Sequence, residues 1–115
     1  MARNEEKLNK INELIAIYVF NWHIHEGAWF DDAAHYKEEA CDWDPATDIR
    51  DAWMVVDKFE FFGFNKSYMG ERRDILYYAS FMLDPGKWTT GETECLAICL
   101  AALTAKGINI EGLRI

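Results

Sequence analysis

The residues best suited to chemistry combine cationic and aromatic side chains in the second half of the chain. A pair of arginines can hold a phosphate group through charge-assisted hydrogen bonds, and an aromatic ring can stack on a nucleobase. The candidate ligand-binding residues are Lys66, Arg72, Arg73, Tyr77, Trp88 and Thr90. Their ligand would be a small anionic nucleotide. The competing interpretation is that the aromatic rings belong to the core and the arginines only charge a hairpin.

Metal-ligand chemistry is a second option, and its strongest signal is the pair His23 and His25. Alternation on a strand would place both imidazoles on one side, as zinc ligands often lie, with His35 and Cys41 downstream. The acidic residues between positions 31 and 44 lack the alternating order and glycine turn of a calcium loop. We expect surface histidines and a solvated acidic loop. The sequence does not decide whether His23, His25, His35 or Cys41 binds a metal.

Catalytic motifs are absent from the sequence. It contains no G-x-S-x-G, no glycine-rich phosphate loop, no recognisable cysteine and histidine arrangement and no carboxylate pair singled out by its spacing. We therefore expect a protein that is not an enzyme and that needs no cofactor.

Composition limits the partners. The net charge of −8 repels duplex nucleic acid and anionic membranes. Residues 1–10 are polar and lack the apolar core of a signal peptide. Three cysteines, an odd number, do not form a disulfide framework, so a reducing cytoplasm fits best. With 115 residues, half of them hydrophobic, the chain is expected to form a single domain over residues 1–115.

One segment, residues 92–106, is expected to organise the fold. It is apolar on all sides, which requires burial on more than one side, yet it is shorter than the roughly 20 residues of a membrane span. Thr93 or Thr90 can cap its start, and Gly107 can end it in the left-handed conformation. Cys95 and Cys99 fall one turn apart inside it and are expected to be buried thiols, although a metal with a third ligand is conceivable. The sequence therefore predicts a buried central helix that can also contribute to a subunit contact.

The other elements are expected around this helix. Apolar residues at three- and four-residue steps predict helices over residues 4–22 and 48–59, the second capped by Asp44 or Thr47. Residues 60–64, 74–83 and 87–90 are strand-like, with turns at 65–71 and at Asp84-Pro85-Gly86. Residues 31–42 are interpreted as an exposed connection, with a helical turn at 33–40. Because three strands follow one another, we expect an α+β fold, an antiparallel sheet of about four strands sandwiched by helices.

Three stretches of the sequence resemble one family, the phage ABA sandwich domain. They are Ile11-Asn12-Glu13-Leu14-Ile15 with Trp22, Trp43-Asp44-Pro45-Ala46-Thr47-Asp48-Ile49 with the following helix, and Glu92-Thr93 with the central helix. The resemblance implies an α/β/α sandwich-like fold and a bacteriophage or prophage origin. The matching residues pack and cap, so they imply no catalytic role.

A phage origin suggests functions in the host cytoplasm. Small phage proteins often counter host defence, so the favoured hypothesis is a non-enzymatic protein that sequesters a nucleotide immune signal. The alternatives are an inhibitor that binds a host defence or regulatory protein directly, and an orphan structural phage protein. The aromatic content and the apolar central helix favour a homo-oligomer, a dimer or higher, in every case.

Overall fold

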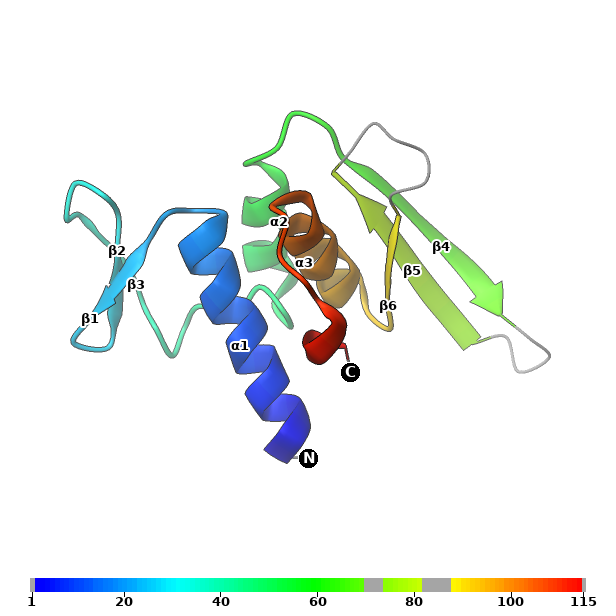
Figure 1. Cartoon of the computed structure of the whole chain (residues 1–115), viewed down its shortest axis with the longest axis horizontal. Coiled ribbons are helices and arrows are strands. Elements are labelled where there is room, and N and C mark those ends of the chain that lie inside the picture. Colours follow the sequence, from blue (N-terminus) through cyan, green and yellow to red (C-terminus); the bar gives the residue numbers. More distant parts are fainter. Residues whose placement is uncertain (1, 70–73, 82–87, 115) are drawn as a thin grey trace.

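A computed structural model describes residues 2–69, 74–81 and 88–114 (Figure 1). The described residues form three α-helices, one short 3-10 helix and two antiparallel sheets of three strands each. In chain order the elements are α1 (Ala2–Tyr18), β1 (His23–His25), β2 (Ala28–Phe30), β3 (Tyr36–Glu39), α2 (Ile49–Val56), β4 (Gly63–Met69), β5 (Asp74–Ser80), β6 (Thr89–Gly91), α3 (Glu94–Ala105) and η1 (Glu111–Leu113).

The helix α3 is the buried centre of the fold, as the sequence predicts. Every residue from Cys95 to Leu103 is buried, because α1, α2 and the strands β5 and β6 all contact this helix. Thr93 caps its start, since the side chain accepts a hydrogen bond from the Leu96 N–H at 3.1 Å. Gly107 follows its end with a φ of 80°, the left-handed conformation that glycine adopts at low cost.

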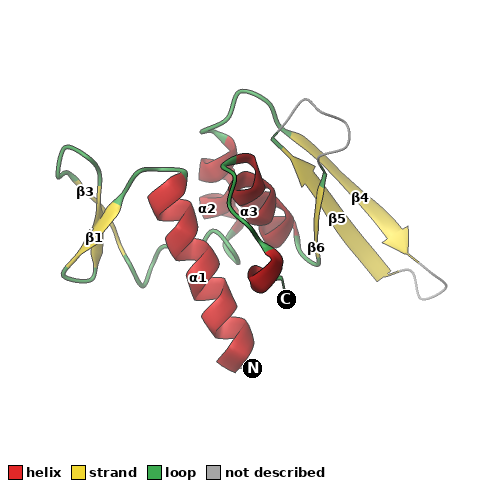
Figure 2. Ribbon diagram, in the orientation of Figure 1, coloured by secondary structure: helices red, strands yellow, loops and turns green. Residues whose placement is uncertain are grey.

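The sheet β4-β5-β6 has two chemically different faces, set by its register. Lys66 pairs with Tyr77 and Asn65 pairs with Tyr78, so the two pairs point to opposite sides. The helices lie on one side of this sheet (Figure 2). We call that side the helix-side face, and it carries Phe64, Lys66, Ile75, Tyr77 and the buried Ala79. The other side, the outer face, carries Asn65, Ser67, Tyr78 and Thr90.

The sheet β1-β2-β3 lies beyond α1, on the side away from α3 (Figure 1). Three buried tryptophans join it to the rest of the molecule. The rings of Trp22 and Trp43 are 4.8 Å apart, and the indole N–H of Trp43 donates to the Asn12 carbonyl at 3.0 Å. Trp29, on β2, is also buried in the common core. The small sheet is thus anchored by side chains at its base, while the residues of β1 are exposed.

The structure corrects the expected strand arrangement. Instead of one sheet of about four strands, the described residues form two sheets of three, and the helices lie on one side of β4-β5-β6. The predicted turn at residues 65–71 is wrong over 65–69, which are strand β4. The predicted helical turn at 33–40 is wrong over 36–39, which pair with β2 as strand β3. Cross-strand pairing overrides the turn-forming tendency of these polar residues in both places.

The helix boundaries also differ from expectation. The first helix ends at Tyr18, four residues before its predicted end, and Asn21 follows with a φ of 59°. The second helix spans 49–56 and is capped by Asp48, whose carboxylate accepts from the Arg50 N–H, rather than by Asp44 or Thr47.

The predicted turn at Asp84-Pro85-Gly86 lies outside the described residues. No helix among the described residues combines the length and apolar content that a bilayer crossing requires.

Candidate functional site

The sheet β4-β5-β6 separates the candidate ligand-binding residues into two groups. Lys66 and Tyr77 lie together on the helix-side face. Thr90 pairs with Tyr78 on the outer face, and the Trp88 ring lies on that face against Gly63. Arg72 and Arg73 lie outside the described residues. Because one ligand cannot contact both faces of a sheet, the predicted set does not form a single site.

The outer face contains a hollow with the chemistry of a small-molecule site. Its volume is about 410 Å³, and it is lined by Asn65, Ser67, Tyr78 and Trp88. The Trp88 side chain is 42% exposed, so the indole offers a ring to solvent. The amide of Asn65, the hydroxyl of Ser67 and the phenol of Tyr78 offer hydrogen bonds beside it. An exposed ring next to such groups suits a flat ligand with polar edges, such as a nucleobase.

Local structure holds these side chains in place. The Asn65 side-chain carbonyl accepts from the Lys66 N–H at 2.9 Å, which orients the amide at the start of the hollow. Trp88 packs so closely on Gly63 that a Cβ at this glycine would lie 2.7 Å from the indole Cη2. The glycine is therefore required for the position of the indole. Sequence reasoning included Trp88 but missed Asn65 and Ser67, because these residues suggested a turn rather than alternate positions of a strand.

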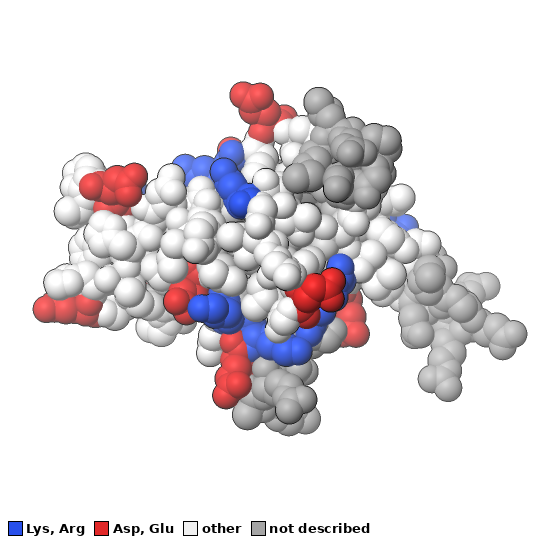
Figure 3. Space-filling model, viewed as in Figure 1, with Lys and Arg blue, Asp and Glu red and all other residues white. Residues whose placement is uncertain are grey.

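A cation that the sequence reasoning did not select lies at β6, in the same sheet. Arg114 donates from Nη1 to the Thr90 hydroxyl at 3.2 Å and to the Thr90 carbonyl at 3.4 Å. Thr90 is paired with Tyr78, which lines the hollow. Lys7 in turn donates to the Arg114 carbonyl at 2.7 Å and fixes the C-terminal segment against α1. In Figure 3, basic side chains gather over α1 and the C-terminal segment, beside acidic ones. Arg114 thus places a guanidinium at β6 on a chain whose net charge is negative.

Another cavity, about 640 Å³, lies between α1 and the small sheet. Trp22, Trp29 and Trp43 line it, but their side chains are only 8%, 4% and 2% exposed, so they offer little ring surface for stacking. Its lining includes the Glu13 carboxylate and contains no lysine or arginine. This cavity is therefore poorly suited to an anionic ligand.

The histidines do not converge on a metal site in the structure. His23 and His25 pack on the ring of Phe30, with centroids 6.5 and 6.2 Å away, and the His35 imidazole lies 3.5 Å from the Asp31 carboxylate. Within the described parts of the chain, no group of three or more histidine, cysteine, aspartate or glutamate side chains is arranged to hold a metal ion.

The two cysteines of α3 are buried thiols. Burial raises the pKa of Cys95 to about 11, with a smaller contribution from the negative charge of Glu94. Burial raises the pKa of Cys99 well above its ordinary value. Both thiols are therefore protonated at neutral pH, and neither is an activated nucleophile.

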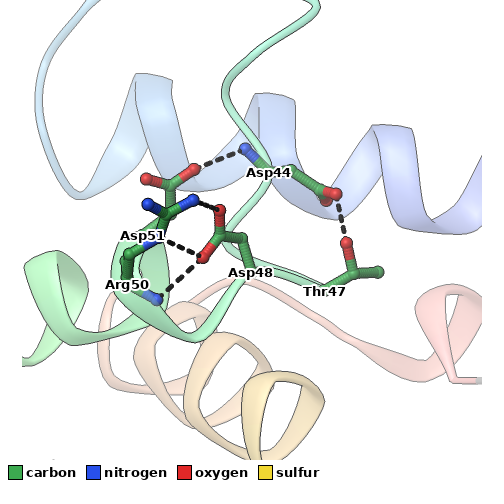
Figure 4. A network of polar contacts seen from close by, with 5 residues as sticks. All are labelled: Asp44, Thr47, Asp48, Arg50 and Asp51. Atoms are coloured by element: carbon green, nitrogen blue, oxygen red, sulfur yellow. Dashed lines mark hydrogen bonds and ion pairs between the residues drawn. The ribbon is translucent and has the colours of Figure 1, made fainter.

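The acidic residues before α2 have a structural role (Figure 4). The Asp51 carboxylate accepts from the Asp44 N–H at 2.9 Å, and Asp44 also contacts Thr47. Burial raises the pKa of Asp51, whereas hydrogen bonds from Arg50 lower the pKa of Asp48. These contacts fix the turn that begins α2.

Asn12 connects that turn to α1. Its amide donates to the Asp44 carboxylate at 2.9 Å and its side-chain carbonyl accepts from the Ala46 N–H at 2.9 Å. The residues that carry the family resemblance in this region therefore pack helices together and do not line the hollow.

Comparison with known proteins agrees with this fold. A model of the phage ABA sandwich domain matches residues 13–103, which is most of the chain. A similar solved structure is the 2.0 Å crystal structure of a phage protein from Bacillus cereus ATCC 14579, with a TM-score of 0.60, 24% sequence identity and 90% of each chain covered. At that identity the likeness concerns the fold alone. The comparison with curated proteins gave no match. With the family model covering both the central helix and the capped turn before α2, the chain belongs to the phage ABA sandwich domain family.

Proposed function

We propose that this protein is a non-enzymatic phage protein that acts in the host cytoplasm and sequesters a nucleotide immune signal of the host. One observation carries the proposal: an indole that is 42% exposed stands beside an amide, a hydroxyl and a phenol in the outer-face hollow. The base would stack on Trp88, and its polar edge would contact Asn65 and Ser67. Such stacking contributes about 1–3 kcal/mol per base.

The phosphate or ribose-phosphate part of the ligand would lie toward the edge of the sheet. Arg114 is held there by Thr90, next to Tyr78. A guanidinium can bind a phosphate with two parallel hydrogen bonds, which is the geometry an anionic ligand needs. The volume of about 410 Å³ lies within the usual range of ligand sites and matches one base with its sugar better than a large cofactor.

A thermal-shift screen with cyclic and ADP-ribose-type nucleotides tests the proposal. A ligand that binds only the folded state adds about 2.7 kcal/mol at a hundredfold excess over its Kd. We expect Trp88→Ala to abolish the shift and Arg114→Ala to weaken it for phosphorylated ligands. The matched control is Tyr36→Ala, because that ring is also exposed, 55%, but lies on β3, away from the sheet β4-β5-β6.

Two results would refute the assignment. One is the absence of a shift with every nucleotide of the panel. The other is a shift that Trp88→Ala leaves at its full size, since the ligand would then bind away from the outer-face hollow.

A further inference from the structure

A second exposed surface runs from α2 onto the helix-side face of the sheet. Successive ring contacts connect it: Trp53 with Phe62 at 5.9 Å, Phe62 with Phe64 at 6.1 Å, and Phe64 with Tyr77 at 5.9 Å between centroids. We call it the aromatic strip, and it comprises Ile49, Trp53, Phe62, Phe64, Ile75 and Tyr77. Ile49 lies one turn before Trp53 on α2, and Ile75 lies on the same face of β5 as Tyr77.

The strip exposes more apolar surface than packing within one chain explains. The exposed fractions are 37% for Ile49, 48% for Trp53, 37% for Phe64 and 41% for Ile75. With about 150–250 Å² for a large side chain, these fractions correspond to roughly 250–400 Å² of apolar surface. A contiguous patch of this size is comparable to the largest that a typical monomer exposes, and such patches are often functional. A stable interface covers about 800 Å² on each partner, so the strip would form its apolar centre and leave a polar rim.

A cavity of about 590 Å³ opens at one end of the strip. Ile49 and Tyr77 belong to both the strip and the lining of the cavity, which also includes Leu96. Trp53 lies one helical turn from Ile49 on α2, and its side chain is 48% exposed. The strip therefore combines an exposed indole with a cavity that shares Ile49 and Tyr77 with it.

Opposite charges lie on this surface too. Lys66 is exposed on the helix-side face beside Phe64 and Tyr77, whereas Glu92 lies at the edge of the cavity. In a symmetric pair each surface meets its own copy, so a surface that holds both members of an ion pair is complementary to itself. Self-complementary shape and self-complementary charge together identify the occupant as a second copy of this chain.

We propose that the aromatic strip is the interface of a twofold-symmetric homodimer, in which Trp53 of each copy inserts into the cavity beside Ile49 and Tyr77 of the other. Lys66 of one copy pairs with Glu92 of the other at the rim. The proposal does not rest on nucleotide binding, because the outer-face hollow lies on the other side of the sheet.

Sedimentation velocity over a concentration series is the first test. The wild-type chain is expected to sediment as a dimer, and Trp53→Ala is expected to shift the series to the monomer, with at least a tenfold weaker association. Met54→Ala is the matched control: it removes a neighbouring side chain on α2 that is 41% exposed and lies outside the strip, so the dimer should persist. Circular dichroism confirms that each variant is folded.

A charge exchange provides a second test, independent of the folding of Trp53→Ala. Lys66→Glu and Glu92→Lys should each weaken the dimer, because each homodimer then holds two pairs of like charges. A mixture of the two variants should form a heterodimer in which both rim ion pairs are restored. A wild-type chain that stays monomeric throughout would overturn the proposal, and so would a dimer that all three variants leave intact. A strip that captures a different protein while the chain stays monomeric would also overturn it. Nucleotide binding is also measured on the monomeric variants. Its presence or absence there tests the proposed function separately from the proposed dimer.

Discussion

Gly91 is the residue at which the packing of the central helix on the sheet can be tested most sharply. It ends β6 and lies directly against the first turn of α3. A Cβ at this position would lie 2.5 Å from the backbone nitrogen of Ala97, 2.9 Å from its Cα and 3.0 Å from the carbonyl carbon of Leu96. These are backbone atoms of the helix, so no side-chain rotation relieves the overlap in Gly91→Ala. Either β6 or α3 must move.

The magnitude follows from two opposing effects. Overpacking of this kind costs about 1–3 kcal/mol, and the upper value applies because the obstruction is backbone. Replacing glycine by alanine also reduces the entropy of the unfolded chain, which returns up to about 1 kcal/mol. The net loss should be about 2 kcal/mol. For a domain of this size that corresponds to a fall in Tm of roughly 6–12 °C.

The assay is thermal and denaturant unfolding of Gly91→Ala beside Gly112→Ala. Gly112 has open space around the position of its Cβ, so its variant should unfold within about 0.5 kcal/mol of the wild-type chain. If Gly91→Ala were as stable as Gly112→Ala, the close packing of β6 on α3 would be wrong.

Three further outcomes follow from the structure. Thr93→Ala should lower the unfolding free energy by about 1 kcal/mol through loss of the α3 cap, and Thr93→Ser should recover most of it in urea titrations. At pH 8 iodoacetamide should add once to the folded chain, at the exposed Cys41, because Cys95 and Cys99 are protonated; mass spectrometry showing two or three adducts would contradict this. Because burial raises the pKa of Asp51, the folded state holds this proton more tightly than the unfolded state, so stability falls as pH rises above the ordinary value of 3.8. Asp51→Asn should flatten that fall in a series of Tm against pH, and an unchanged slope would contradict the assignment.

The elements that could be predicted are those with local signals. The central helix carries a capping threonine, a terminal glycine and an apolar surface on every side, and all three signals concern residues adjacent in the chain. Strand β5 is rich in residues that favour strands, and its prediction is confirmed over 74–80. The family was also recognisable, because its matching residues are those that cap and pack.

The elements that could not be predicted depend on distant partners. Asn65 and Ser67 favour turns in isolation, yet they lie in β4 because they pair with Tyr78 and Leu76 of β5. Residues 36–39 form a strand only because β2 is beside them. Their composition gives no sign of that partner, and so the second sheet was missed.

The candidate site shows the same limit. Composition selected Trp88 as a ligand-binding candidate together with Lys66 and Tyr77. The structure places Trp88 on the outer face and the other two residues on the helix-side face. A shift of one residue along a strand reverses the face on which a side chain lies. Arg114 was missed because 24 residues separate it from Thr90, and only the fold brings the two together.

The attachment of the small sheet through three tryptophans has a consequence for how the molecule opens. Among the described residues its strands form ladders only with one another, and all three residues of β1 are exposed. This region can therefore lose its pairing while α3 stays closed, as a separate cooperative unit. Amide protons of β1 and β3 should exchange with deuterium much sooner than those of α3. A protease that cuts near residue 33 should leave a nicked molecule whose remaining part still unfolds in a single step.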